Sequence, residues 1–184
     1  MTINGYRMIQ KLSELDEFHK KQDPWNYENN DEDLKRIDYL LKQLHSKTYN
    51  KVLDIGCGQG FVTKQLPGTE IVGVDISEEA IKHAKSSNKD YHINYLSCSI
   101  FDLNTNFSNN RFDLIVITGV LYPQYIGNSS SLIYLIIDKL LNKGGTLISV
   151  HIDSWYKCQF PYFKAKEILY PYRTYNHKLE VYIK

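Results

Sequence analysis

A short apolar strand that runs straight into three closely spaced glycines is the feature that most constrains this chain. In KVLDIGCGQGF, residues 51–61, the apolar run 52–55 is followed by Gly56, Gly58 and Gly60. Glycine has no Cβ, so a turn rich in glycine lets backbone atoms approach a ligand closely. In open α/β sheets such turns lie at the carboxyl ends of the strands, where ligands bind. The stretch therefore predicts a ligand-binding turn in an α/β protein.

The rest of the chain alternates between strand-like and helix-like segments. We expect strands at residues 52–55, 71–75, 91–97, 112–118 and 145–151, and helices from about 31 to 45 and at 59–66, 78–87 and 129–141. Such alternation predicts a parallel sheet covered by helices on both faces. The final run, ILYPYRTYNHKLEVYIK, reads instead as two strands joined near Asn176 and His177. So short a link permits only an antiparallel hairpin at one end of the sheet.

Length and patterning fit a single domain. We read residues 1–184 as one unit, with residues 1–30 as a polar, irregular arm or lid and residues 31–184 as the core. Asn30 or Asp31 is expected to cap the first core helix, and Ser77 the helix at 78–87. The polar stretch DLNTNFSNNR, residues 102–111, is expected to be a loop.

The net charge and the cysteines indicate which kinds of partner and which cellular compartment to expect. The net charge of +1 provides no general attraction to nucleic acid or a membrane, and the longest apolar run, 114–122, is too short to span a bilayer. The amino-terminal stretch lacks the layout of a signal peptide. Cys57, Cys98 and Cys158 form no CxxC pair, which suggests neither a disulfide framework nor a zinc site. We expect a cytoplasmic protein with no metal and no membrane partner; its oligomeric state is open.

Two acids near the glycine turn predict the charge of its ligand. The dinucleotide fingerprint GxGxxG needs a glycine where this chain has Phe61, so a nicotinamide-dependent oxidoreductase is disfavoured. Asp54 would repel a pyrophosphate and favour a cationic group. Asp75 ends the second expected strand, where a carboxylate accepts hydrogen bonds from ribose hydroxyls, and Ile76 is expected to lie against a purine. S-adenosylmethionine meets these conditions; a turn that only tightens a strand–helix junction is the alternative.

Four segments together carry a resemblance to a known superfamily. VLDIGCGQG, IVGVDIS, RFDLIVITGVLY and KGGTLIS, in this order and spacing, resemble the class I S-adenosylmethionine-dependent methyltransferases over residues 30–184. The resemblance implies an enzyme with a Rossmann-like, doubly wound, seven-stranded sheet, mostly parallel with an antiparallel last strand. It also implies S-adenosylmethionine as cofactor and S-adenosylhomocysteine as product.

The resemblance also implies roles for individual residues. Asp54 and the turn formed by Gly56, Cys57, Gly58 and Gly60 would flank the methionine part of the cofactor, Asp75 would hold the ribose, and the backbone from Thr118 to Val120 would lie by the ammonium group. Related enzymes often hold the adenine amino group with an acid after the third strand. This chain has SCSIFD there, so the backbone or Ser99 is expected to take that role, or adenine is held less tightly.

A weaker resemblance concerns the methyl acceptor. DPWNY together with GVLY is similar to a small-molecule branch that includes nodulation-type and deoxysugar amine N-methyltransferases. Trp25 and Tyr27 are expected either to close over the cofactor and exclude water or to anchor the arm to the core. The arm and residues 152–168 are then expected to form the acceptor pocket.

His151 and Tyr122 are the candidates for catalytic side chains. An amine acceptor needs only to be neutral, whereas a hydroxyl benefits from a base, worth roughly 100- to 10,000-fold. His151 ends the fifth expected strand at the edge that holds the glycine turn, and the ordinary histidine pKa of about 6.5 suits a base. A histidine that only hydrogen-bonds a loop is the equal alternative. Tyr122 is expected to position the acceptor or the cofactor methyl, or to pack in the core.

The leading interpretation is a methyltransferase acting on an oxygen or nitrogen of a small molecule. The acceptor class we favour is a sugar or a nucleotide-linked or phosphorylated metabolite. The alternatives are an RNA, tRNA or protein methyltransferase and a non-catalytic cofactor-binding module. Nucleic acid is disfavoured because only a modest basic cluster is present, formed by Lys157, Lys164, Lys166 and Arg173.

Overall fold

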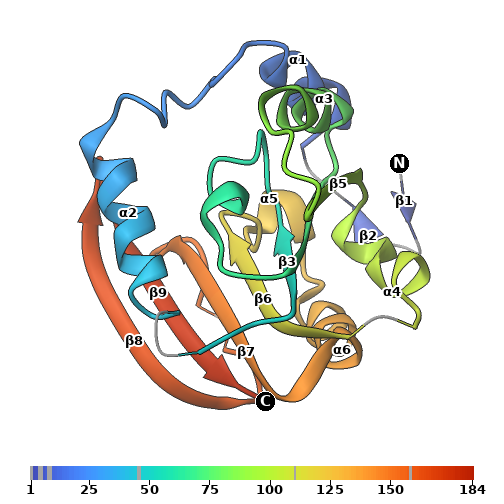
Figure 1. The fold of residues 1–184 in the computed structure, drawn as a ribbon, viewed down its shortest axis with the longest axis vertical. Coiled ribbons are helices and arrows are strands. Elements are labelled where there is room, and N and C mark those ends of the chain that lie inside the picture. Colours follow the sequence, from blue (N-terminus) through green and yellow to red (C-terminus); the bar gives the residue numbers. More distant parts are fainter. Residues whose placement is uncertain (1, 4–5, 8–9, 45–46, 110, 158) are drawn as a thin grey trace.

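A seven-stranded sheet forms the centre of the computed structural model, which describes residues 2–3, 6–7, 10–44, 47–109, 111–157 and 159–184 (Figure 1). The strands are β3 Lys51–Ile55, β4 Glu70–Asp75, β5 Ile93–Ser97, β6 Phe112–Thr118, β7 Leu141–Ile152, β8 Phe163–Tyr172 and β9 Tyr175–Ile183. Their order across the sheet is β5-β4-β3-β6-β7-β9-β8. The pairs from β5 to β7 are parallel, and β9 runs antiparallel to both of its neighbours. The predicted Rossmann-like sheet with an antiparallel last strand is confirmed.

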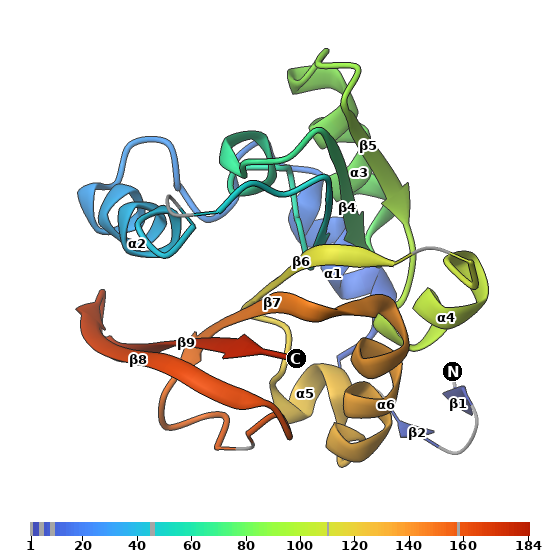
Figure 2. The same cartoon turned by 60° about the horizontal axis from the view of Figure 1, so that its bottom comes forward.

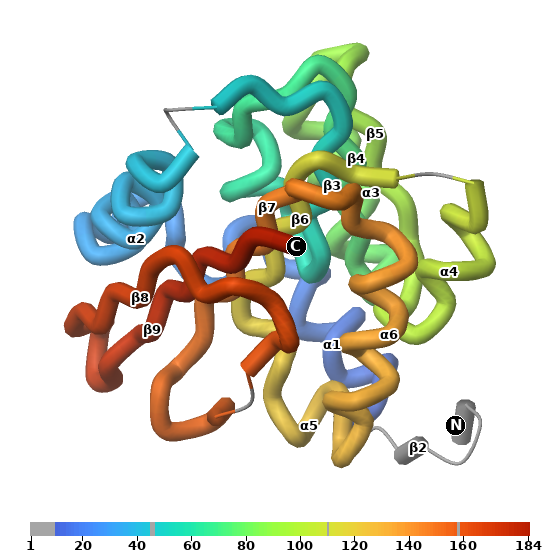
Figure 3. The backbone as a smooth tube through the Cα atoms, turned by 90° about the horizontal axis from the view of Figure 1, so that it is seen from below, coloured from blue at the N-terminus to red at the C-terminus, as the bar shows by residue number. Residues whose placement is uncertain are grey.

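Helices cover both faces of the sheet. They are α1 Leu12–His19, α2 Asp31–Leu41, α3 Glu78–Ser87, α4 Leu103–Asn106, α5 Pro123–Ile126 and α6 Ser130–Leu140, with 3-10 turns η1 Thr63–Gln65 and η2 Ile100–Asp102 and a small ribbon of β1 Thr2–Ile3 and β2 Tyr6–Arg7. Two core clusters result: α2 and α3 pack on one face of the sheet and α4–α6 on the other (Figure 2). The hairpin of β8 and β9 lies at one end of the molecule, with α2 against β8 (Figure 3).

Local sequence signals account for the helix starts and the central strands. The Asn30 side chain accepts a hydrogen bond from the Glu32 amide at 2.9 Å, and the Ser77 hydroxyl accepts one from the Ala80 amide at 3.2 Å. Both predicted caps are confirmed, and α3 has its predicted bounds. The continuous apolar run in β6 is buried on both faces, as expected of a central parallel strand. The first core helix was expected to continue to about His45, but α2 ends at Leu41 with Lys42 as its C-cap; His45 itself lies outside the described residues.

The predicted helix at residues 59–66 is wrong. Only the 3-10 turn η1 forms there. Gly58 and Gly60 have φ angles of +53° and +84°, which no right-handed helix contains, so a helix cannot begin before residue 61. Pro67 follows too soon for a full α-helix to form.

Three further expectations are corrected by tertiary contacts. The arm is not wholly irregular, because it contains α1, tied to α3 by a 2.7 Å hydrogen bond from the Ser77 hydroxyl to Asp16. Residues 102–111 are not all loop, since Leu103 and Phe107, four residues apart, bury one face of a short helix. The hairpin turns at residues 173–174 rather than near 176–177, with Arg173 at φ +52°.

Tyr95 on β5 occupies space left by two glycines. A Cβ on Gly60 would lie 2.6 Å from the Tyr95 hydroxyl, and a Cβ on Gly73 would lie 2.8 Å from its ring. The buried ring therefore packs directly against the backbone of the glycine turn and of β4.

Candidate functional site

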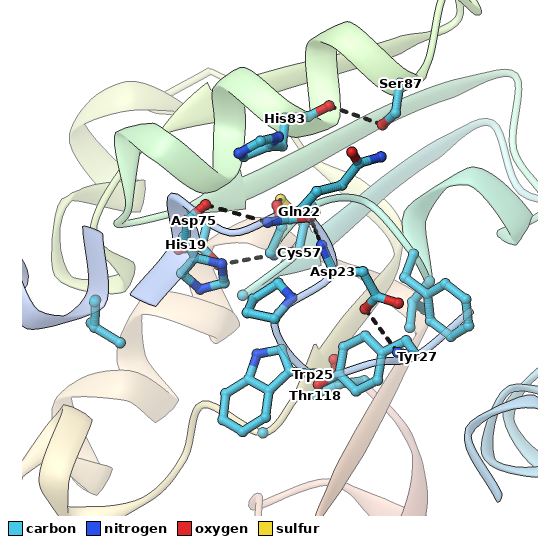
Figure 4. A pocket seen from close by; sticks show the side chains of 18 of the residues that line it. His19, Gln22, Asp23, Trp25, Tyr27, Cys57, Asp75, His83, Ser87 and Thr118 are labelled. Carbon is cyan, nitrogen blue, oxygen red and sulfur yellow. Dashed lines mark hydrogen bonds between the residues drawn. The ribbon is translucent and has the colours of Figure 1, made fainter. Parts of the chain in front are cut away.

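A cavity of about 380 Å³ opens at the carboxyl ends of β3, β4 and β6. Its floor contains Gly56, Cys57, Gly58, Asp75, Ile76 and Thr118, and the arm covers it with residues that include His19, Trp25 and Tyr27. Figure 4 shows these arm side chains facing Asp75, Cys57 and Thr118. Eight of the eleven residues that the sequence assigns to the cofactor thus line one cavity.

Asp75 is held at the edge of the cavity by the glycine turn. Its carboxylate accepts hydrogen bonds from the Gly58 and Ser77 amides, both at 2.9 Å. Burial raises the pKa of Asp75, and these amide hydrogen bonds oppose the rise. The carboxylate is therefore oriented by the backbone while its remaining lone pairs can face a ligand.

Ser99 lies in a smaller cavity of about 50 Å³ that shares Asp75, Ile76 and Tyr125 with the main one. The Ser99 hydroxyl accepts a hydrogen bond from the Phe101 amide at 3.3 Å and caps η2. Cys98 lines the same small space. The two cavities therefore adjoin at Asp75, Ile76 and Tyr125.

Asp54, at the end of β3, and Gly60, in the turn itself, line neither cavity. Asp54 is completely buried and accepts a 2.7 Å hydrogen bond from the Thr63 hydroxyl. Its Oδ1 atom has no hydrogen-bond partner within the described residues. Burial raises the pKa of Asp54 to about 7. The acid is therefore poised to ionise when positive charge arrives nearby.

Arg36 on α2 lines the cavity and was not identified from the sequence. Its guanidinium lies 4.8 Å from the centre of the Tyr27 ring and 3.5 Å from an Asp33 carboxylate oxygen. Only 7% of the residue is exposed, and its Nε finds no partner in the described part of the chain. A buried cation with an unused donor suits an anionic ligand group. The only sequence signal for this role is that Asp33 and Arg36 are three residues apart on one helix. The same spacing occurs in ion pairs on solvent-exposed helices, so it does not identify a binding residue.

Gln59 clips the arm onto the glycine turn. Its side-chain oxygen accepts a 2.8 Å hydrogen bond from the Asp23 amide, and its side-chain nitrogen donates to the Lys21 carbonyl at 2.9 Å. Beyond the clip, Tyr27 stacks on Phe61 with ring centres 5.2 Å apart. A glutamine bound to a distant backbone leaves no local pattern, so this role could be found only in three dimensions.

His151 and Tyr122 are not brought to the cavity. His151 is 1% exposed, and its Nε2 lies 3.9 Å from Glu180 within the β7–β9 pairing. Burial lowers the pKa of His151 to about 4. The Tyr122 hydroxyl accepts a 2.9 Å hydrogen bond from the Ile152 amide, and burial raises its pKa to about 12. Tyr125, three residues on, lines the cavity instead.

The remaining charged groups do not form one basic face. Lys164 bridges Glu167 and Glu180, and Arg173 donates to Asp33 at 2.7 Å. Among the described residues no group of three or more His, Cys, Asp or Glu side chains is placed to hold a metal ion. Within the same residues no helix combines the length and apolar character needed to cross a bilayer.

The strand order and the cavity at the carboxyl ends of the strands define a doubly wound α/β protein with a ligand-sized cavity at its glycine turn. Residues 46–178 match the methyltransferase domain family. The chain belongs to this family, and the resemblance to class I S-adenosylmethionine-dependent methyltransferases is confirmed.

Individual relatives agree with this assignment. The N-methyltransferase NodS from Bradyrhizobium japonicum, in complex with S-adenosyl-L-homocysteine, has a TM-score of 0.78 at 22% identity, over 95% of this chain and 99% of that one. Malonyl-[acyl-carrier protein] O-methyltransferase of Acetivibrio thermocellus is 22% identical over 77% of this chain and 46% of its own length. Demethylmenaquinone methyltransferase of Staphylococcus saprophyticus is 27% identical over 68% of this chain and 56% of its own length. This chain thus spans about half the length of the curated relatives that it matches.

Proposed function

We propose that this chain transfers the methyl group of S-adenosylmethionine to a small molecule. The observation that carries the proposal is the joining of Asp75, the glycine turn and Thr118 in one cavity beneath an aromatic arm. An amino- or hydroxy-sugar, free or nucleotide-linked, is the acceptor class we favour. The names of the relatives, an N-methyltransferase, a malonyl-[acyl-carrier protein] O-methyltransferase and a demethylmenaquinone methyltransferase, point to chemically different acceptors and do not choose among them.

The residues of the cavity fit this cofactor. A Cβ placed on Gly58 or Gly119 would meet no described heavy atom within 4 Å, so both glycines border open space. Asp75 would accept hydrogen bonds from the ribose, and Ile76 would contact the adenine, whose far end would enter the small cavity beside Ser99. Arg36 would bind the carboxylate of the methionine part.

The bound cofactor supplies a sulfonium methyl group with a thioether as leaving group. The protein then has mainly to align the acceptor and exclude water. Trp25 and Tyr27 cover the cavity from the arm, and the Gln59 clip holds that cover in place. Tyr125 lines the wall next to Thr118 and Val120, where an acceptor would meet the methyl group.

A nitrogen acceptor fits these residues better than an oxygen acceptor. The sequence offered His151 as a base for a hydroxyl, but its imidazole is 1% exposed and packs edge-to-face on Tyr156. A neutral amine attacks without prior loss of a proton, so it does not need this group. The catalytic roles of His151 and Tyr122 stay predictions.

The test is a pair of measurements on the purified chain. Calorimetric titration with S-adenosylhomocysteine should show one saturable site, and labelled S-adenosylmethionine should then methylate glucosamine faster than glucose. Binding without transfer to any amine or hydroxyl acceptor would instead favour a non-catalytic cofactor-binding module. A complete lack of binding by folded protein would overturn the proposal.

A further inference from the structure

Two half-exposed aromatic side chains stand in contact outside the cavity. Trp155, in the loop after β7, and Tyr175, the first residue of β9, are 41% and 43% exposed. Their ring centres are 5.3 Å apart and the ring planes meet at 67°. Single exposed aromatic residues are common, but two in contact present a combined surface on which a ligand ring can pack. We name this pair, Trp155 and Tyr175, the aromatic shelf.

A row of rings connects the aromatic shelf to the cavity. Trp155 lies edge-to-face on Tyr122 with ring centres 5.3 Å apart, and Tyr122 lies 6.2 Å from Tyr125. Tyr125 lines the cavity next to the expected position of the reacting methyl. Neither residue of the aromatic shelf lines the cavity, and the Tyr122 ring between them is buried. An acceptor that contacts both Tyr125 and the aromatic shelf therefore extends beyond the unit that is methylated.

The backbone beneath the aromatic shelf is held in place before any ligand arrives. The Asp153 amide donates to the Asn176 carbonyl at 2.9 Å, which joins the loop after β7 to β9. Lys178 pairs with the Asp153 carboxylate at 2.5 Å. A surface that is already ordered loses little conformational entropy on binding, which favours recognition by a small number of contacts.

We propose that the aromatic shelf binds a second saccharide ring of the acceptor, linked to the unit that is methylated; this inference rests on the proposed function. A pyranose has apolar C–H faces and polar hydroxyls at its rim. Its faces suit the corner between Trp155 and Tyr175, and the adjacent Asp153–Lys178 pair can bind its hydroxyls. A flat nucleobase would be sandwiched best between parallel rings, and rings at 67° do not provide such a slot.

Fluorescence can test the aromatic shelf directly, because the chain has only two tryptophans, Trp25 and Trp155. In a Trp25→Phe variant saturated with S-adenosylhomocysteine, the β-1,4-linked trimer of glucosamine should change Trp155 emission saturably. We expect the trimer to bind about tenfold more tightly than glucosamine itself, as one added aromatic contact supplies about 1.4 kcal/mol. Uridine diphosphate, titrated in parallel, should have a smaller effect.

Matched variants decide the outcome. In the Trp25→Phe background, Tyr175→Ala should weaken trimer binding about tenfold, while Tyr175→Phe, which keeps the ring, should retain it. Tyr91→Ala, at a fully exposed ring in the turn before β5, is the control and should change nothing. Equal affinities for monomer and trimer, a Tyr175→Ala effect no larger than the control, or stronger binding of uridine diphosphate would overturn the inference. Intact methyl transfer alongside any of these results would leave the proposed function standing, whereas failure to bind S-adenosylhomocysteine would remove the proposed function itself.

Discussion

Burial shifts the pKa values of three groups in the two halves of the sheet in opposite directions. The half around β3 and β4 contains Asp54, whose pKa burial raises to about 7. The half around β7 and β9 contains His151 and His177, whose pKa values burial lowers to about 4 and about 3. Burial thus favours the neutral form of Asp54, His151 and His177. A cationic ligand can restore the charge of Asp54, whereas the two histidines are enclosed by protein.

The halves also differ in how their polar contacts are built. Asp75 binds the amides of Gly58 and Ser77, within 17 residues of itself. Asp33, in contrast, binds Tyr172 and Arg173, 139 and 140 residues further along the chain. The first arrangement follows from a local motif, and the second exists only after the hairpin has docked on α2. The comparison teaches that the glycine-turn side of the cavity is encoded locally and the α2 side by long-range packing.

The largest effect is expected from Asp75→Ala. Loss of hydrogen bonds between a charged group and the ribose should weaken S-adenosylhomocysteine binding by about 1–3 kcal/mol, which calorimetry can measure. Asp90→Ala, at an exposed acid before β5, is a matched control and should leave the affinity unchanged. Unaltered binding by folded Asp75→Ala would show that the ribose lies elsewhere.

Arg36→Met should have the next largest effect. We expect about a tenfold loss of affinity for S-adenosylhomocysteine, since a charge-assisted contact to its carboxylate disappears. The affinity for 5′-methylthioadenosine, which lacks the amino-acid group, should not change. Asp33 keeps Tyr172 and Arg173 as partners, so the fold should persist. Equal losses for both ligands would place Arg36 outside the carboxylate site.

The charge of Asp54 should make cofactor binding depend on pH. A positively charged ligand favours the carboxylate, so affinity should rise with pH up to about 7 and then level off. Below that point the loss should approach tenfold per pH unit. Calorimetry from pH 5.5 to 8.5 measures this slope, and Asp54→Asn should flatten it. The same slope in both proteins would assign the proton to another group.

The last effect concerns folding stability instead of binding, and it involves His151 in the hairpin half. Its folded pKa of about 4 is below the unfolded value, so its contribution is complete above about pH 6.5 and is lost as pH falls towards 4. Urea unfolding should show the wild type losing up to about 1.4 kcal/mol per pH unit more than His151→Gln in this range. Above pH 7 the difference between the two proteins should be constant. Parallel curves throughout would mean that the imidazole is not enclosed in solution.

Features decided by short stretches of chain were predictable from the sequence. β6, the bounds of α3, the caps at Asn30 and Ser77 and the family all follow from local patterns. The helix predicted at 59–66 does not form because Gly58 and Gly60 have positive φ angles, which are incompatible with the first turn of a right-handed helix. The pattern of apolar residues does not reveal these angles.

The part of the cavity formed by α2 and the arm was less predictable because its residues are placed by distant partners. Arg36 and Gln59 look like ordinary surface residues until α2 and the arm meet the glycine turn. His151 was placed correctly near a strand end, but β7 continues through Ile152 and His151 faces Tyr156 and Glu180. Strand periodicity alone does not say which of two covered faces borders the ligand.

The packing of Tyr95 into the space of two glycines has an evolutionary consequence. Two observations require glycine at position 60. Its φ of +84° is a conformation that other residues rarely adopt, and a Cβ there would lie 2.6 Å from the Tyr95 hydroxyl. At Gly73, in contrast, the nearest atoms to a Cβ are those of the Tyr95 ring. Substitutions at 73 and 95 should therefore be epistatic: a side chain at 73 becomes acceptable only in a lineage that has first lost the ring at 95. The third glycine of the motif, Gly60, is therefore needed for packing against Tyr95 as well as for the shape of the turn.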